Sequence, residues 1–232
     1  MEAQGYRALN GNHLKLLAAL AMLLDHIGVL LFPNVQLLRI IGRLAYPIFA
    51  FMIAEGCQHT ANKLRYFLMV FGLGAACQLV YFFVSGDTYL NILLTFSLSI
   101  LLTYLLQAVH AAGDWKRQVL WSTLFAVGVF AVMVIDLYLS IDYGFWGILT
   151  PVFAAFSRGK GKTDSKLSVL MIFLGLLLLS ADLGGNQYYS LLAIPLLLLY
   201  NGQRGKANLK YFFYIFYPAH LAVLQGIDWI LE

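Results

Sequence analysis

The hydrophobic pattern of this chain consists of long apolar runs separated by short polar segments. The first run, residues 14–32, has about the 20-residue length that an α-helix needs to cross a membrane. Barrel strands would instead alternate apolar and polar residues over about ten positions. The pattern therefore predicts an all-α, polytopic membrane bundle of about nine transmembrane helices. Their expected ranges are 14–32, 36–55, 64–84, 89–109, 119–138, 143–156, 167–183, 188–200 and 209–231.

The composition supports one membrane domain over residues 1–232, because 61% of the residues are hydrophobic and only 11% are charged. Soluble domains carry about 25% charged residues. The net charge of +4 requires no nucleic-acid partner. Cys57 and Cys77 have no metal-ligand spacing, so we expect no metal and interpret both as packing residues. The sequence leaves the oligomeric state open.

Apart from Arg39 and Arg43, which lie within the second expected helix, the lysines and arginines lie at every second connection of this predicted helix map. The other connections contain Asp87 and Asp142 but no basic residue. By the positive-inside rule, this bias predicts a cytoplasmic N-terminus and an outer C-terminus. We therefore expect a multi-pass protein of the bacterial inner membrane, in contact with membrane lipids. The residues on the predicted cytoplasmic side are Arg7, Lys15, Lys63, Arg65, Lys116, Arg117, Arg158, Lys160, Lys162, Lys166, Arg204, Lys206 and Lys210.

Asp25 and His26 interrupt the first apolar run. An ionisable residue at the centre of a membrane helix costs about 2.5–3.5 kcal/mol on insertion scales, so such residues usually pair or serve a function. Adjacent side chains on a helix diverge by about 100°, so Asp25 is not expected to orient His26. We expect Asp25 to pair with an arginine or with a distant histidine. That leaves His26 as the predicted catalytic residue, with a hydrogen-bonded structural role as the alternative.

Arg39 and Arg43 lie four residues apart in the second expected helix and therefore on one face. Both must face protein, water or an anion, because arginine is costly against lipid. A guanidinium suits a carboxylate or a phosphate equally well. Two roles remain open, a structural ion pair with Asp25 or the binding of an anionic ligand. We expect Arg39 to be the more structural residue and Arg43 to bind the anion.

Tyr217, Pro218 and His220 lie near the middle of the last expected helix. Proline removes one backbone hydrogen bond and disturbs the helix around it. A Tyr and a His beside such a break suggest the wall of a polar cavity. The alternative is an aromatic belt together with a packing histidine.

These residues resemble the TraX family over nearly the whole chain, and most specifically in its first 50 positions. The shared motifs are Asp25-His26-Ile27-Gly28, residues 39–51, Glu55-Gly56, Asp142-Tyr143-Gly144 and residues 213–221. The named member of that family N-acetylates pilin. More distantly, the chain resembles transmembrane acyltransferases with an intramembrane catalytic histidine. The matching site residues are Asp25, His26, Arg39, Arg43, Glu55 and His220.

The resemblance implies an acyltransferase that moves an acetyl group from cytoplasmic acetyl-CoA to an amine or hydroxyl at the membrane or its outer face. His26 would be the general base or carry the acyl group, and Tyr217 or His220 would stabilise the oxyanion. The acceptor would be a pilin-like peptide N-terminus, a glycan or another envelope component. The residues expected to bind the donor are Arg39, Arg43, Glu55, Lys63 and Arg65.

Two alternative functions use the same residues differently. Intramembrane Asp, His and Arg residues also form the proton relays of transporters, so a small proton-coupled permease is one alternative. The lack of two similar halves in the chain disfavours it. A non-catalytic assembly scaffold, held together by the polar groups, is the other.

Overall fold

The computed structural model describes residues 8–86, 88–156 and 165–231. Within these residues every regular element is a helix, which confirms the all-α class. Six helices are long and apolar enough to cross a membrane, and α7 is a shorter apolar helix. The chain is therefore an integral membrane protein, whereas the count of nine spans and their orientation stay predictions. The elements are α1 (Gly11–Leu30), α2 (Gln36–Gly42), α3 (Ala45–His59), α4 (Lys63–Ser85), α5 (Ile92–Ala111), α6 (Trp115–Tyr138), α7 (Gly144–Phe156), α8 (Ser165–Leu183), the 3₁₀ helix η2 (Gly185–Ala193), α9 (Ile194–Leu198) and α10 (Lys210–Leu231).

The described residues form two compact units. Unit 1 contains the residues up to Met52 and those from Gly184 onward, and unit 2 runs from Ile53 to Leu183. The boundary falls inside α3, so a single helix belongs to both units. A compact unit is not by itself an independently folding domain. The expectation of one domain over residues 1–232 thus stays a prediction.

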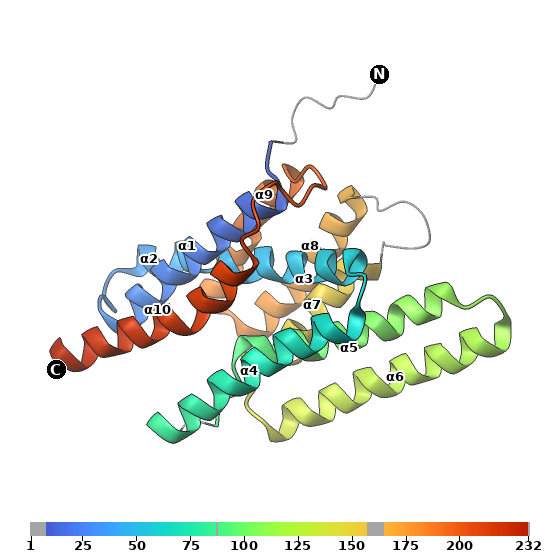
Figure 1. The fold of residues 1–232 in the computed structure, drawn as a ribbon, viewed down its shortest axis with the longest axis horizontal. Helices are drawn as coiled ribbons and strands as arrows, with labels where there is room; N and C mark the ends of the chain where they lie inside the picture. The colour runs from blue at the N-terminus through green and yellow to red at the C-terminus, as the bar shows by residue number, and fades with distance from the viewer. Residues whose placement is uncertain (1–7, 87, 157–164, 232) are drawn as a thin grey trace. The chain divides into compact units, whose positions relative to one another are not determined.

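In unit 1, α1 packs against α2 and α10, and η2 packs against α2 and α9. Figure 1 shows α1 in blue and α10 in red side by side. Asn10 caps α1, because its side chain accepts a hydrogen bond from the His13 backbone N–H at 3.0 Å. Asn12, two residues before the apolar run 14–32, is the cap that the sequence alone predicts, and this prediction is wrong. Asn12 is buried within the first turn, and its side chain donates to the Ala207 carbonyl at 2.7 Å.

The second expected span is present, because Gln36–His59 is long and apolar enough to cross a membrane, but its helix is interrupted instead of continuous. Helix α2 ends at Gly42, and Arg43 and Leu44 form a turn before α3 begins. The break has a local cause in Pro47, whose ring would clash with the Arg43 carbonyl in a continuous helix. Because α3 restarts at Ala45, Pro47 falls in its first turn, where a missing N–H costs nothing.

The eighth expected helix, residues 188–200, is replaced by η2 and the short α9. The buried residues of η2 are Gln187, Ser190 and Ala193. This spacing of three matches the 3.0-residue turn of a 3₁₀ helix, which places every third side chain on one line. The tighter winding thus presents a single narrow face, with Gln187 at its start, to the rest of unit 1.

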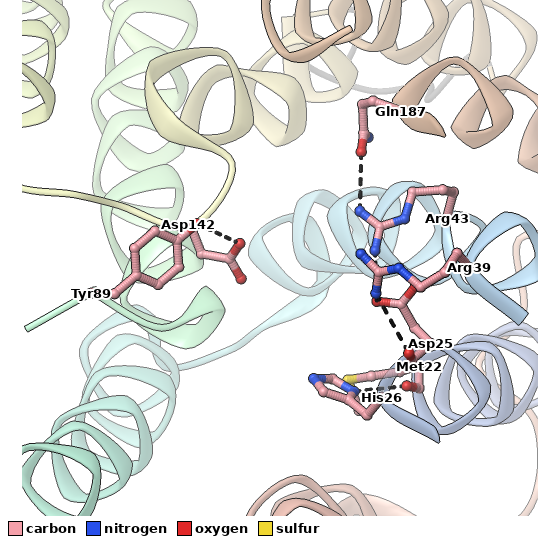
Figure 2. A network of polar contacts seen from close by, with 8 residues as sticks. All are labelled: Met22, Asp25, His26, Arg39, Arg43, Tyr89, Asp142 and Gln187. Atoms are coloured by element: carbon pink, nitrogen blue, oxygen red, sulfur yellow. Dashed lines mark hydrogen bonds and ion pairs between the residues drawn. The ribbon is translucent and has the colours of Figure 1, made fainter. Parts of the chain in front are cut away.

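In unit 2, α5 packs against α4, α6 and α7, and α7 also packs against α6 and α8. Buried hydroxyls join these helices: Ser99 donates to the Ile148 carbonyl at 2.7 Å. The loop before α7 is held in the same way, because Thr95 donates to the Asp142 carbonyl at 2.8 Å. The Asp142 carboxylate accepts from the Tyr89 hydroxyl at 3.2 Å, a contact also drawn in Figure 2.

Candidate functional site

The Asp25 carboxylate of α1 binds both arginines of the second segment through one oxygen. Its Oδ2 lies 2.6 Å from Arg43 Nη2 and 2.8 Å from Arg39 Nη1. Figure 2 shows that this carboxylate points toward the arginines, whereas the His26 ring points away from them. Both expectations for Asp25 are confirmed: it pairs with arginine, and it does not orient its neighbour His26.

Gly42 makes this approach possible. It is the last residue of α2, and a Cβ placed on it would overlap the Asp25 Oδ1 and Cβ atoms. No larger residue fits at this position without moving the carboxylate. The glycine between the two arginines therefore lets α1 and α2 come close enough for both guanidinium groups to reach one oxygen.

Helix η2 adds a partner that sequence reasoning missed. Arg43 Nη1 donates to Gln187 Oε1 at 3.4 Å, as Figure 2 shows. Near the starts of α2 and η2, the Gln36 side-chain amide donates to Asn186 Oδ1 at 3.3 Å. The available signal was a polar residue directly after the Gly184-Gly185-Asn186 turn and before an apolar run. It was missed because a regular α-helix was expected there.

The structure brings His26 and His220 together from α1 and α10. Their ring centroids lie 5.0 Å apart, with the planes 71° from parallel. Each Nδ1 lies beside a backbone carbonyl one turn earlier, 2.8 Å from Met22 O for His26 and 2.7 Å from Phe216 O for His220. A carbonyl only accepts hydrogen bonds, so Nδ1 must carry the proton. In the neutral ring, Nε2 of each histidine therefore holds the lone pair.

His220 Nε2 is buried and has no hydrogen-bond partner among the residues that the structure describes. Its ring stacks on Phe216, with centroids 4.8 Å apart, and the Tyr217 ring lies 6.0 Å away. A buried, unpaired polar atom in a folded protein calls for an explanation, such as a catalytic role or a bound molecule. The two histidines and Tyr217 thus form one group, as the sequence suggested.

The other residues expected to bind the donor belong to unit 2. Glu55 is buried, with Oε2 3.6 Å from His59 Nδ1. The Lys63 ammonium lies 5.0 Å from the centroid of the Tyr104 ring, and Arg65 is exposed in the first turn of α4. Their role toward the donor stays a prediction.

Among the described residues, no group of three or more His, Cys, Asp or Glu residues is arranged to hold an ion. Cys57 and Cys77 are both buried and form no disulfide bond with a described residue.

Comparison with known proteins agrees with the resemblance seen in the sequence. The profile of the TraX protein matches residues 10–228. The chain belongs to the TraX family. It is also 27% identical over 256 residues to a protein described as a probable fimbrial assembly protein FimC, serogroup H1, of Dichelobacter nodosus, with 94% of this chain and 96% of that protein covered.

A second match is local. An uncharacterized protein of Rickettsia prowazekii (strain Madrid E) is 55% identical over 38 residues, which are 16% of this chain and 15% of that protein. No solved structure matches the chain.

Proposed function

We propose that this TraX-family protein is a membrane-embedded acyltransferase. It moves an acetyl group from cytoplasmic acetyl-CoA to an amine or hydroxyl of an acceptor at the membrane or its outer face. The observation that carries the proposal is the His26–His220 pair. Two imidazoles, each with its tautomer fixed by a backbone carbonyl, place two basic nitrogens in one group of a membrane protein.

The geometry supports a general-base role for His26. Its Nε2 would take the proton from the acceptor O–H or N–H while the acceptor attacks the thioester carbonyl. The tetrahedral intermediate then expels the coenzyme A thiolate, which takes that proton from the imidazolium. The alternative is that Nε2 attacks the carbonyl itself and carries the acetyl group to the acceptor.

Tyr217 suits the stabilisation of the oxyanion better than His220 does. An oxyanion needs hydrogen-bond donors, and the Tyr217 side chain carries an O–H group. His220 in its neutral form offers only a lone pair at Nε2, because Nδ1–H is held by the Phe216 carbonyl. His220 therefore fits a second proton acceptor beside His26.

The acceptor class follows from what the chain resembles. One relative is described as a probable fimbrial assembly protein. This supports a pilin-like peptide N-terminus as the first acceptor to test, with glycans and other envelope components next. The phosphates of coenzyme A need cations, for which Lys63 and Arg65 at the start of α4 are the candidates.

The test combines binding and transfer. Protein purified in lipid nanodiscs is titrated with acetyl-CoA by calorimetry, and envelope fractions are incubated with radiolabelled acetyl-CoA with and without the protein. We expect acetyl-CoA binding, together with label in an envelope component that depends on the protein. A protein that neither binds acetyl-CoA nor labels any component would instead be a permease or a scaffold.

A further inference from the structure

The ionic group around Asp25 carries an excess of positive charge. One carboxylate faces two guanidinium groups, which leaves a net charge of +1. All three residues lie in the first two candidate membrane spans. An unbalanced charge at such a position is costly, and proteins keep it when a ligand or a pathway uses it.

The two arginines differ in the exposure of their side chains and in their hydrogen-bond partners. The side chain of Arg43 is 14% exposed and contacts both Asp25 and Gln187. The side chain of Arg39 is 31% exposed. Both of its hydrogen bonds, to Asp25 Oδ2 and to the Asp25 carbonyl, leave from the single nitrogen Nη1. Its Nη2 and Nε have no partner among the described residues.

We infer that Arg39 binds an anionic group of the acceptor, a phosphate or a carboxylate. The inference rests on the proposed function and names the chemistry of its acceptor. A guanidinium presents several N–H groups in a flat fork, which matches two oxygens of either anion. One monovalent anion at Arg39 would bring the group to neutrality. The sequence favours Arg43 for binding an anion of the donor or the site, whereas exposure and unused donors favour Arg39.

The position of Arg39 indicates that the anion it binds belongs to the acceptor and not to the donor. Arg39 Nη1 lies 3.5 Å from the carbonyl of Asp25, the residue directly before His26. In acetyl-CoA the whole pantetheine arm separates the thioester from the phosphates. A donor that reaches His26 through an extended arm would hold its phosphates away from this part of α1. An anion on the acceptor has no such spacer to place it elsewhere.

The experiment measures anion binding without acetyl-CoA. Wild type, Arg39→Gln and the control Arg117→Gln are placed in phosphatidylcholine nanodiscs, and the melting temperature is followed in sodium phosphate against sodium chloride of equal ionic strength. Arg117 is an exposed arginine of α6 that pairs with Asp114 at 3.4 Å, so its loss removes the same charge elsewhere. A second arm replaces part of the phosphatidylcholine by phosphatidylglycerol, without added phosphate.

We expect an anion-dependent rise in melting temperature for wild type and for Arg117→Gln, and none for Arg39→Gln. Phosphate affinity should fall about 10- to 100-fold in that variant, the usual effect of losing a hydrogen bond to a charged group. A rise with phosphate assigns a free or soluble anion, and a rise only with phosphatidylglycerol assigns a lipid-borne one. No rise in wild type, or an equal rise in Arg39→Gln, overturns the inference.

Arg39→Gln should fold, because Asp25 and Arg43 remain as a neutral pair. If it does not, Arg39→Lys keeps the charge without the flat fork, and its phosphate affinity should still be reduced. Acetyl-CoA affinity should be unchanged in either variant. A loss of acetyl-CoA affinity there would assign the anion to the donor and overturn the inference, while leaving the proposed function standing. Failure of wild type to bind acetyl-CoA overturns the proposed function instead.

Discussion

Both units bury polar side chains, but the chemistry of those side chains differs. Unit 2 buries the single carboxylate of Glu55 and a larger set of neutral hydroxyls, and each of three described hydroxyls bonds to a backbone carbonyl. Unit 1 holds a partly buried carboxylate against two guanidinium groups and two imidazoles edge to face. The hydroxyls of unit 2 that show this pattern are Thr95, Ser99 and Thr150.

The difference separates packing from function. A serine or threonine in a membrane helix satisfies its hydroxyl on a nearby carbonyl and costs little to keep. Ionisable groups are expensive at membrane depth and persist where they pair or act. Polar burial alone therefore does not identify a site. The excess positive charge around Asp25, found in unit 1, identifies a site better.

The largest effect should come from His26→Ala. Losing a general base typically lowers the rate about 10²- to 10⁴-fold, and more if the histidine carries the acyl group. The fold should survive, because the ring makes one hydrogen bond, to the Met22 carbonyl of its own helix. The measurement is the transfer of radiolabelled acetyl from acetyl-CoA to envelope fractions, at matched protein level and melting temperature.

His13→Ala is the matched control for that variant. His13 lies on the same helix, is exposed, and contacts the cap residue Asn10. It should transfer acetyl groups at the wild-type rate. A His26→Ala protein that works within a few-fold of wild type would make His26 structural and turn attention to His220.

Asp25→Ala should be the most damaging change to stability. It leaves two arginines without their carboxylate, and removing one partner of a buried ion pair costs about 3–5 kcal/mol. Arg39→Gln, which leaves a neutral pair, should be far milder. Unfolding in detergent titrations measures both. If the two variants were equally stable, the balance of positive and negative charges would not determine the stability of the ionic group around Asp25.

Much of the site could be predicted from the sequence, because an unpaired charged side chain is costly in a membrane. An ion pair of Asp25 with an arginine was expected. The spacing of four residues placed Arg39 and Arg43 within reach of the same carboxylate. The meeting of His26 with His220 needed more, because α1 and α10 lie at opposite ends of the chain. The resemblance, which implies one site for both histidines, and the position of His220 near the middle of the last helix pointed to it.

The features that the sequence did not reveal depend on local backbone geometry. The break after Gly42 follows from where Pro47 can sit, and apolar periodicity does not report it. The sequence of η2 is apolar enough to predict an α-helix. Its tighter 3₁₀ winding, however, places Gln187 beside Arg43. The cap at Asn10 rather than Asn12 arises from distant contacts, since the carbonyls of Gln203 and Arg204 accept from the first turn of α1.

Gly42→Ala tests the close approach of α1 and α2 in unit 1 by adding a single methyl group. The added Cβ would overlap the Asp25 side chain, and overpacking of this kind typically costs about 1–3 kcal/mol. Acetyl transfer should fall with it, because the arginines lose their shared partner. Gly226→Ala in α10 is the control, since a Cβ there meets nothing within 4 Å. It should be neutral, or stabilising by up to about 1 kcal/mol.

A smaller effect should come from Ser99→Ala in unit 2, and it tests the other half of the comparison. Ser99 is fully buried, and its hydroxyl donates to Ile148 O of α7 at 2.7 Å and to Thr95 O of its own helix at 3.1 Å. Hydrogen bonds between membrane helices are worth about 0.6 kcal/mol on average and up to about 1.7. Stability should fall by that amount, with acetyl transfer unchanged.

Ser97→Ala is the natural partner of that variant, because the Ser97 hydroxyl donates only to Leu93 O within α5, at 2.7 Å. It should cost less than Ser99→Ala, since no contact between helices is lost. Detergent titration gives both free energies, and the envelope assay gives both rates. If Ser99→Ala instead abolished transfer at full stability, the hydroxyls of unit 2 would belong to the chemistry. The contrast between charged function and neutral packing would then fail.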